Sequence, residues 1–191
     1  TSNFAAGSRM FNVSIGVAFR KNMVFGAVFA PKLDEFFWAQ KGAGAFLNGK
    51  RIRVNSNKLT DAVVACSVLH ATKSGQDRPD LKILREISTV ARSPRTHGSA
   101  ALELCYVASG ILSGFIAAQQ HPWDFAAGSL IVEEAGGKVT DFKGSRLFSS
   151  GFHTNSVVAS NRKIHSRLRF ICKTALGQSG NARPKSHKTQ K

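Results

Sequence analysis

Several residue types and patterns are scarce in this chain of 191 residues, and each absence excludes a class of protein. No stretch approaches the ~18–20 consecutive apolar residues of a membrane span, and the N-terminus lacks the basic and then apolar order of a signal peptide. The three cysteines, Cys66, Cys105 and Cys172, stand apart without the spacing of a zinc site. We therefore expect reduced thiols, a cytoplasmic location and no membrane association.

Acidic residues are also scarce, with 11 Asp and Glu against 27 Lys and Arg and a formal charge of +16. The chain begins with Thr1 and has no acid before Asp34, so we expect it to be a fragment that lacks its natural beginning. Residues 161–191 hold nine basic residues and no acid, and within the expected tail of residues 175–191 the stretch GQSGNARPKSHKTQK, from Gly177, is polar without apolar periodicity. This composition predicts a disordered basic tail, which is either a solvated terminus or a weak nucleic-acid contact.

The first 60 residues predict an antiparallel meander, the remainder of a sheet subdomain. Residues 11–19 alternate, with Phe11, Val13, Ile15 and Val17 on one side, and residues 23–30 and 35–40 are two further strands. Asn48-Gly49 between apolar residues is a strong hairpin signal, because both residues accept a positive φ.

Residues 61–174 predict an α/β subdomain in which strands alternate with helices. Strands are expected at residues 62–68, 93–96, 111–117, 138–141 and 155–160. Helices are expected at residues 78–92, 98–110, 124–135 and 162–173. The fold class is therefore α/β, a layered α+β arrangement in which the meander packs against the alternating half.

Residues 121–140 (HPWDFAAGSLIVEEAGGKVT) hold the densest set of candidate functional residues. Asp124 precedes the small residues Ala126, Ala127 and Gly128 at the start of a helix, where N–H groups favour phosphate and a carboxylate can hold a hard cation. The alternative for Asp124 is an ordinary N-cap. Glu133 and Glu134 are read as a solvated face, Trp123 as a core anchor, Glu103 as structural, and His97 and His121 as packing or rim residues.

Four passages resemble the inositol monophosphatase family, the Mg²⁺-dependent, lithium-sensitive phosphatases. PWDFAAGSLIVEEAGG, from Pro122, resembles its C-terminal signature, and TSNF, from Thr1, resembles the end of its Asp-Pro-(Ile/Leu)-Asp-Gly-Thr motif. GAGAFLNGKRIRV, from Gly42, and HGSAALELCYVASG, from His97, are similar to its Asn-Gly hairpin and its Gly-Ser-Ala-Ala helix. The resemblance implies a layered sugar-phosphatase-like fold.

The resemblance also implies roles for matching residues. Asp124 would be a metal ligand, Thr1 a catalytic residue that orients the attacking water, and Gly98, Ser99 and Ala100 a substrate-binding turn. The cofactor would be Mg²⁺, with Li⁺ as an inhibitor, and the complete protein would be a homodimer. The remaining metal ligands would precede Thr1. Ala117 stands where animal members have a substrate-binding Glu, which leaves the exact substrate open.

The leading hypothesis is a Mg²⁺-dependent phosphomonoesterase that hydrolyses a small polyol or sugar phosphate with a metal-activated water. Two alternatives remain beside it: a catalytically dead fragment without the N-terminal metal ligands, or another superfamily activity such as a 3′(2′),5′-bisphosphate nucleotidase. A third, from another class, is a nucleic-acid-binding protein that uses the basic tail.

Overall fold

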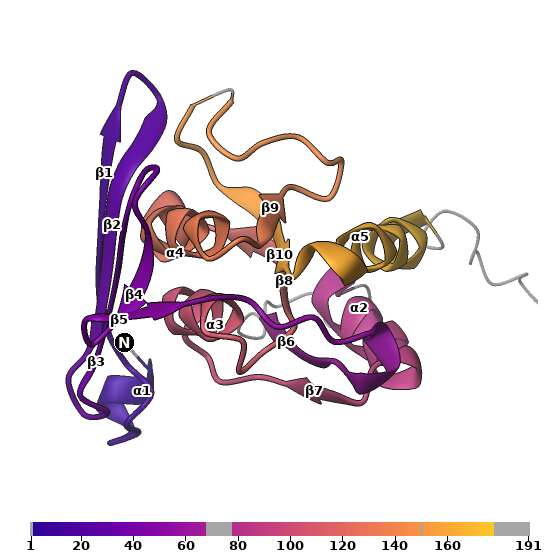
Figure 1. Ribbon diagram of the computed structural model, residues 1–191. Coiled ribbons are helices and arrows are strands. Elements are labelled where there is room, and N and C mark those ends of the chain that lie inside the picture. Colours follow the sequence, from indigo (N-terminus) through magenta and orange to yellow (C-terminus); the bar gives the residue numbers. More distant parts are fainter. Residues whose placement is uncertain (1, 68–77, 150, 178–191) are drawn as a thin grey trace, which may run out of the picture.

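The computed structural model describes residues 2–67, 78–149 and 151–177, and it contains two five-stranded sheets. The first sheet is an antiparallel meander in chain order, after the short helix α1 (Ser2–Ala5). Its strands are β1 (Val13–Phe19), β2 (Asn22–Ala30), β3 (Glu35–Gln40), β4 (Gly44–Leu47) and β5 (Lys50–Ile52). We call it sheet A, and it forms one edge of the molecule in Figure 1.

The second sheet, sheet B, has the order β7-β6-β8-β10-β9. β6 pairs in parallel with β7 and β8, whereas β10 is antiparallel to β8 and β9. The short helix η1 (Leu59–Asp61) precedes the strands β6 (Val63–Ser67), β7 (Ser93–Arg95), β8 (Gly114–Gln120), β9 (Lys138–Thr140) and β10 (Asn155–Ser160).

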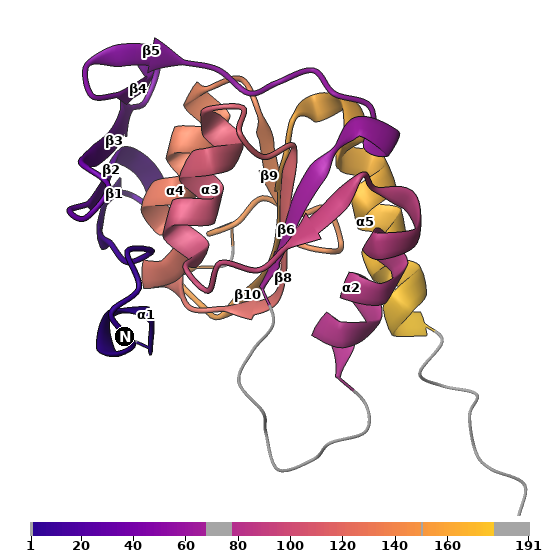
Figure 2. The same cartoon turned by 90° about the horizontal axis from the view of Figure 1, so that it is seen from below.

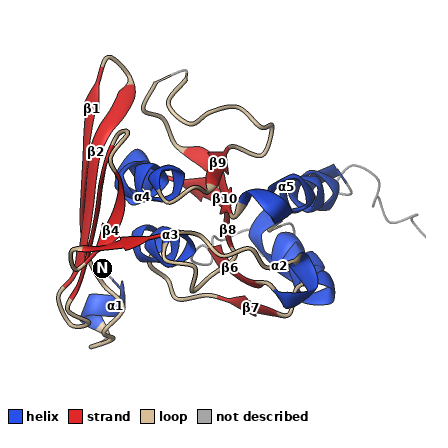
Figure 3. Ribbon diagram, in the orientation of Figure 1, coloured by secondary structure: helices blue, strands red, loops and turns tan. Residues whose placement is uncertain are grey.

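Four helices complete the layers, which Figures 2 and 3 show from two sides. α3 (Ala100–Ala108) and α4 (Pro122–Glu134) lie between the two sheets, and α4 contacts strands of both. α2 (Pro79–Val90) and α5 (Arg162–Gly177) pack together on the other face of sheet B. The order of layers is sheet A, α3 with α4, sheet B, and α2 with α5. The layered α+β fold expected from the sequence is confirmed.

Local sequence signals located most elements well. Asn48 and Gly49 have φ angles of +48° and +78° and join β4 to β5, as the hairpin signal predicted. The strand predicted at residues 111–117 is displaced, because Ile111 is exposed after the Gly110 turn and β8 begins at Gly114. The last helix continues past residue 173 to Gly177, since Ala175 is buried. The rest of the predicted tail, residues 178–191, and Val68 lie outside the described residues.

Small residues set the spacing between sheet A and α4. A Cβ on Gly26 would lie 2.8 Å from the carbonyl oxygen of Ala127, and one on Gly128 would lie 2.6 Å from the Cβ of Leu104 in α3. The small residues that follow Asp124 in the sequence do not open the α4 backbone to a ligand at these positions. They let β2 and α3 approach it instead, because any larger side chain would force these elements apart.

The outer face of sheet A is apolar and faces solvent. Val13, Ile15, Val17 and Phe19 are between 45% and 64% exposed. Their strand neighbours that point inward are small residues, such as Gly16, which meets α4. Aromatic residues extend the outer face across the sheet, where the ring of Trp38 stacks on that of Phe46 with centroids 4.4 Å apart.

In the described ranges, no helix combines the length and the apolar character needed to cross a membrane.

Candidate functional site

A cavity of about 560 Å³ opens where the N-terminal segment and β1 meet the starts of α3 and α4. The turn at Gly98, Ser99 and Ala100 lines this cavity together with Asp124. The structure thus brings together four of the five predicted site residues, from segments more than 20 positions apart in the sequence. The fifth, Thr1, lies outside the described residues, although Ser2 and Asn3 line the cavity.

The Gly98 turn is held from both sides by hydrogen bonds. Gly98 has a φ of +75°, which a glycine adopts without strain. The Asn3 amide donates to the carbonyl oxygens of His97, at 2.8 Å, and Met10, at 2.7 Å. The backbone N–H of His97 donates to Glu103 Oε1 at 2.7 Å, and His97 Nδ1 lies 3.1 Å from the same oxygen. The buried Glu103 is therefore structural, as predicted, and the backbone of His97 helps to hold the turn without lining the cavity.

Ser99 begins α3 but does not cap it with its hydroxyl. The Ser99 Oγ instead accepts a hydrogen bond of 2.6 Å from the Asn12 amide of the N-terminal segment. The first turn of α3 consequently has no side-chain cap, and Ala100 and Ala101 of this turn line the cavity. Uncapped N–H groups at a helix start carry partial positive charge, which favours an anionic group such as a phosphate.

Asp124 occupies the third position of α4 and not the N-cap position, which His121 holds. The backbone N–H of His121 donates to Asp124 Oδ2 at 3.2 Å, as in a capping box. No described residue donates a hydrogen bond to the other oxygen of Asp124. One carboxylate oxygen thus fixes the helix start, and the second is available at the cavity.

Trp123 corrects a second sequence expectation, because it is 68% exposed and anchors no core. Its ring stacks on His121, with centroids 4.6 Å apart and planes inclined by 12°. His121 Nδ1 lies 3.0 Å from the Thr154 hydroxyl, which fixes the imidazole beneath the indole. The motif position of Trp123 therefore puts an aromatic surface at the rim of the cavity.

The sequence reading missed or left open the polar residues at the strand ends. Ser67 ends β6 and Gln120 ends the parallel strand β8, and the Gln120 amide donates to the Ser67 hydroxyl at 2.9 Å. Both line the cavity, as does Asn12. Ligands commonly bind outside the carboxyl ends of parallel strands, so the strand assignments were the signal that could have found them. Ala117 is buried in β8 and is not part of the lining.

The side chains around this cavity offer few ligands for a metal ion. In the part of the chain that the structure describes, no group of three or more His, Cys, Asp or Glu side chains could hold one. Asp124 is the single carboxylate among the described residues that line this cavity. Mg²⁺ requires near-octahedral oxygen ligation, so these residues do not by themselves form a magnesium site.

The sequence of this chain is similar to those of a known protein family. The model of the inositol monophosphatase family matches residues 1–175. An inositol-1-monophosphatase of Mesorhizobium japonicum is 38% identical over 170 residues, which are 88% of this chain and 62% of that protein. The inositol monophosphatase 2 of Solanum lycopersicum is 48% identical over 150 residues, which are 77% of this chain and 56% of that protein.

Solved structures agree with the sequence comparison. The IMPase of Thermotoga maritima superposes with a TM-score of 0.83 at 34% identity, over 94% of this chain and 67% of that one. The chain therefore spans about three fifths of the curated relatives above, at 62% and 56% of their length.

Proposed function

Because the chain belongs to the inositol monophosphatase family, we propose that it carries the substrate-facing part of a Mg²⁺-dependent phosphomonoesterase site. The substrate is a small polyol or sugar phosphate. The observation that carries this proposal is the convergence of Asp124 and the Gly98 turn on one polar cavity, since the two come from separate motifs.

Each element has a task that its chemistry supports. The uncapped start of α3 binds the phosphate through backbone N–H groups, and Ser99, fixed by Asn12, contacts the substrate beside it. Gln120 and Ser67 offer hydrogen bonds to the hydroxyls of a polyol. Thr1 is assigned to orienting the attacking water, and it lies outside the described residues.

Asp124 would contribute its available oxygen as one ligand of Mg²⁺. A bound Mg²⁺ would supply a water of lowered pKa and positive charge near the leaving oxygen. Mg²⁺ needs several oxygen ligands, and the described residues around this cavity supply one carboxylate. That observation favours a second candidate, in which the 191-residue chain by itself is catalytically inactive.

Phosphate release from inositol 1-phosphate, a sugar phosphate and a 3′,5′-bisphosphate nucleotide tests the proposal, with and without Mg²⁺ and Li⁺. We expect hydrolysis of the first or second substrate, dependence on Mg²⁺, and inhibition by Li⁺. Asp124→Asn should reduce the rate at least ~100-fold, because even the partners of metal ligands contribute 10–100-fold. Asp61→Asn is the matched control, since Asp61 is an exposed acid of η1 and does not line the cavity.

The outcomes separate the two candidates. An Asp124→Asn variant that retains the full rate contradicts the metal-ligand role. A wild-type chain that hydrolyses none of the substrates, and that binds no Mg²⁺ in calorimetry, supports the inactive chain instead.

A further inference from the structure

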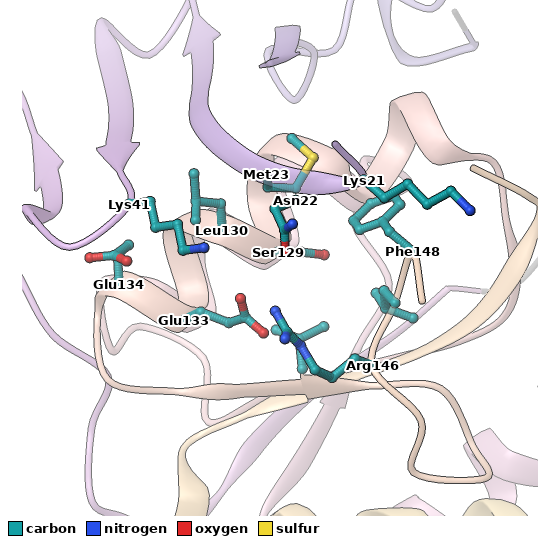
Figure 4. A pocket seen from close by; sticks show the side chains of 12 residues that line it. Lys21, Asn22, Met23, Lys41, Ser129, Leu130, Glu133, Glu134, Arg146 and Phe148 are labelled. Carbon is teal, nitrogen blue, oxygen red and sulfur yellow. The ribbon is translucent and has the colours of Figure 1, made fainter. Parts of the chain in front are cut away.

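A second cavity lies at the C-terminal end of α4, away from Asp124. Its volume is about 90 Å³, and Figure 4 shows the side chains around it. Ser129 and Glu133 of α4, Lys41 of the β3–β4 turn and Arg146 of the loop after β9 all contribute to the lining. With Met23 of β2, which also lines it, the site is assembled from four segments that only the packed fold brings together.

Ser129 supplies an independent sign that something polar belongs in this cavity. Its side chain is 4% exposed, and its Oγ has no hydrogen-bond partner among the described residues. A buried hydroxyl normally donates to a nearby carbonyl, and leaving it unpaired costs free energy. Because Ser129 lines the cavity, a ligand there can accept the missing hydrogen bond.

The charges around the cavity are not neutralised by direct ion pairs. The ion pairs that the structure gives for its described residues are Arg78–Asp80 and His97–Glu103, and neither belongs to this site. Glu134 is engaged elsewhere, since its two oxygens accept the backbone N–H groups of Gly42, at 2.8 Å, and Gly44, at 2.9 Å.

Two cationic groups and one carboxylate therefore face one another across the opening. In Figure 4 the side chains of Lys41 and Arg146 point toward the region of Glu133, whereas Lys21 extends outward past Phe148. Partial burial, the largest cause, raises the pKa of Glu133, while Arg146, Arg162 and Lys41 act in the opposite direction and Glu134 adds to the rise. The Glu133 carboxyl therefore takes up a proton more readily than a free one, which lessens its repulsion of an anion.

We propose that this cavity binds a small oxyanion of the size of phosphate, held by Arg146 and Lys41 and by a hydrogen bond from the Ser129 hydroxyl. A guanidinium presents paired N–H donors that match two oxygens of such an anion, and an ammonium adds a point charge. The volume of about 90 Å³ admits a group of a few atoms. This site goes beyond the proposed function, because it lies at the opposite end of α4 and uses none of the residues assigned there.

The two methionines of the chain allow a test that reads each cavity separately. Met10 lines the Asp124 cavity and Met23 lines the Ser129 cavity. A chain labelled with ¹³C-methyl methionine is titrated with inorganic phosphate into the millimolar range, at constant ionic strength set by NaCl. We expect the Met23 resonance to shift with saturation. A Met23 resonance that does not move overturns the proposal, whatever Met10 does.

Matched variants assign the response to the named groups. Arg146→Ala should weaken the apparent affinity read from Met23 about tenfold or more, because it removes charge-assisted hydrogen bonds. Lys143→Ala removes an exposed charge of the same loop outside this cavity, and it should leave the affinity within about twofold. Equal weakening in both variants would mean general attraction to a basic chain and would overturn the site. Asp124→Asn should leave the Met23 response intact, which separates this test from that of the proposed function.

Ser129→Ala should change the Tm in the opposite direction from the same substitution at a buried serine that is hydrogen-bonded. Without phosphate its Tm should be unchanged or higher, since an unpaired hydroxyl is removed, and the rise of Tm with phosphate should be lost. Ser160→Ala is the control, because the buried Ser160 Oγ is already paired with His165 Nδ1 at 2.9 Å, and its loss should lower the Tm with or without phosphate. A Ser129→Ala chain with a lower Tm and a full phosphate response would contradict the proposal.

Discussion

Sheets A and B have five strands each, yet they are covered to different extents. Sheet B has helices on both faces, with α3 and α4 on one side and α2 and α5 on the other. Sheet A has α4 on its inner face, whereas its outer face of Val13, Ile15, Val17 and Phe19 is exposed. Apolar side chains are thus covered by helices on both faces of sheet B, whereas those on the outer face of sheet A are exposed to water.

This difference shows that alternation of apolar residues identifies the two faces of a strand but does not reveal which face is buried. In β1 the larger side chains point outward, and the inward positions are small because α4 approaches closely at Gly16. Exposed apolar surface of this extent is unusual for a chain that remains alone. The inner face, and not the more hydrophobic one, holds sheet A to the rest of the molecule.

Adjacent phenylalanines of β3 give the sharpest test of this contrast. Phe37 is 0% exposed on the inner face, and Phe36 is 41% exposed on the outer face. Phe37→Ala should lower the free energy of unfolding by about 3–5 kcal/mol, because it leaves a cavity in the core. Phe36→Ala should cost about 1 kcal/mol or less. Urea denaturation measures both, and equal costs would show that the outer face is packed in solution.

The buried histidine of the other sheet region should make stability depend on pH. His165 is 1% exposed and lies between two hydroxyls, with Nδ1 2.9 Å from Ser160 Oγ and Nε2 3.0 Å from Thr140 Oγ1. Burial, with smaller contributions from Lys138 and Arg169, lowers the pKa of His165 from 6.5 to about 4. The unfolded chain therefore binds a proton in this window that the folded chain does not.

Stability is accordingly lost as the pH falls from 6.5 toward 4, by up to on the order of 3 kcal/mol. Denaturant unfolding across this window measures the slope, and His165→Gln should flatten it. A slope that persists in this variant would assign the pH dependence to other groups.

The smallest expected effect on stability concerns the outer face itself. Ile15→Thr combined with Val17→Thr keeps β-branched residues in β1, so the free energy of unfolding should change by about 0.5 kcal/mol or less. Self-association should fall, because exposed apolar surface on an edge strand promotes pairing between chains. Sedimentation at increasing protein concentration measures this. Leu81→Thr is the control, since Leu81 is an exposed apolar residue of α2, and it should leave association unchanged.

Local patterns predicted much of the fold. The ends of β3 and β10 matched the expected residues 35–40 and 155–160, because turn residues bracket both strands. Helix periodicity located α2 within the expected residues 78–92, where the structure buries Ile83 and Ile87 and leaves Leu81 exposed. The periodicity of apolar residues shows that the helix has an apolar face, but the elements that pack against the helix determine which residues of that face are buried.

Those residues of the candidate site that belong to sequence motifs could be predicted. Features that depend on contacts between distant segments could not. The sequence motifs pointed to Asp124 and the Gly98 turn, and both line one cavity. The exposure of Trp123 was not predictable, because it depends on a stack with His121 and on Thr154, which is 33 residues from His121. The unpaired hydroxyl of Ser129 was equally invisible, because whether a buried serine finds a hydrogen-bond partner depends on the segments that pack around it.

The position of α4 in the chain has a consequence for synthesis. Sheet A ends at Ile52, and α4, which covers its inner face, begins at Pro122. A ribosome that adds about 5–20 residues per second needs on the order of ten seconds to make the roughly 70 intervening residues. During that interval the nascent meander exposes apolar residues on both sides, so holdase chaperones should engage it until the helix emerges.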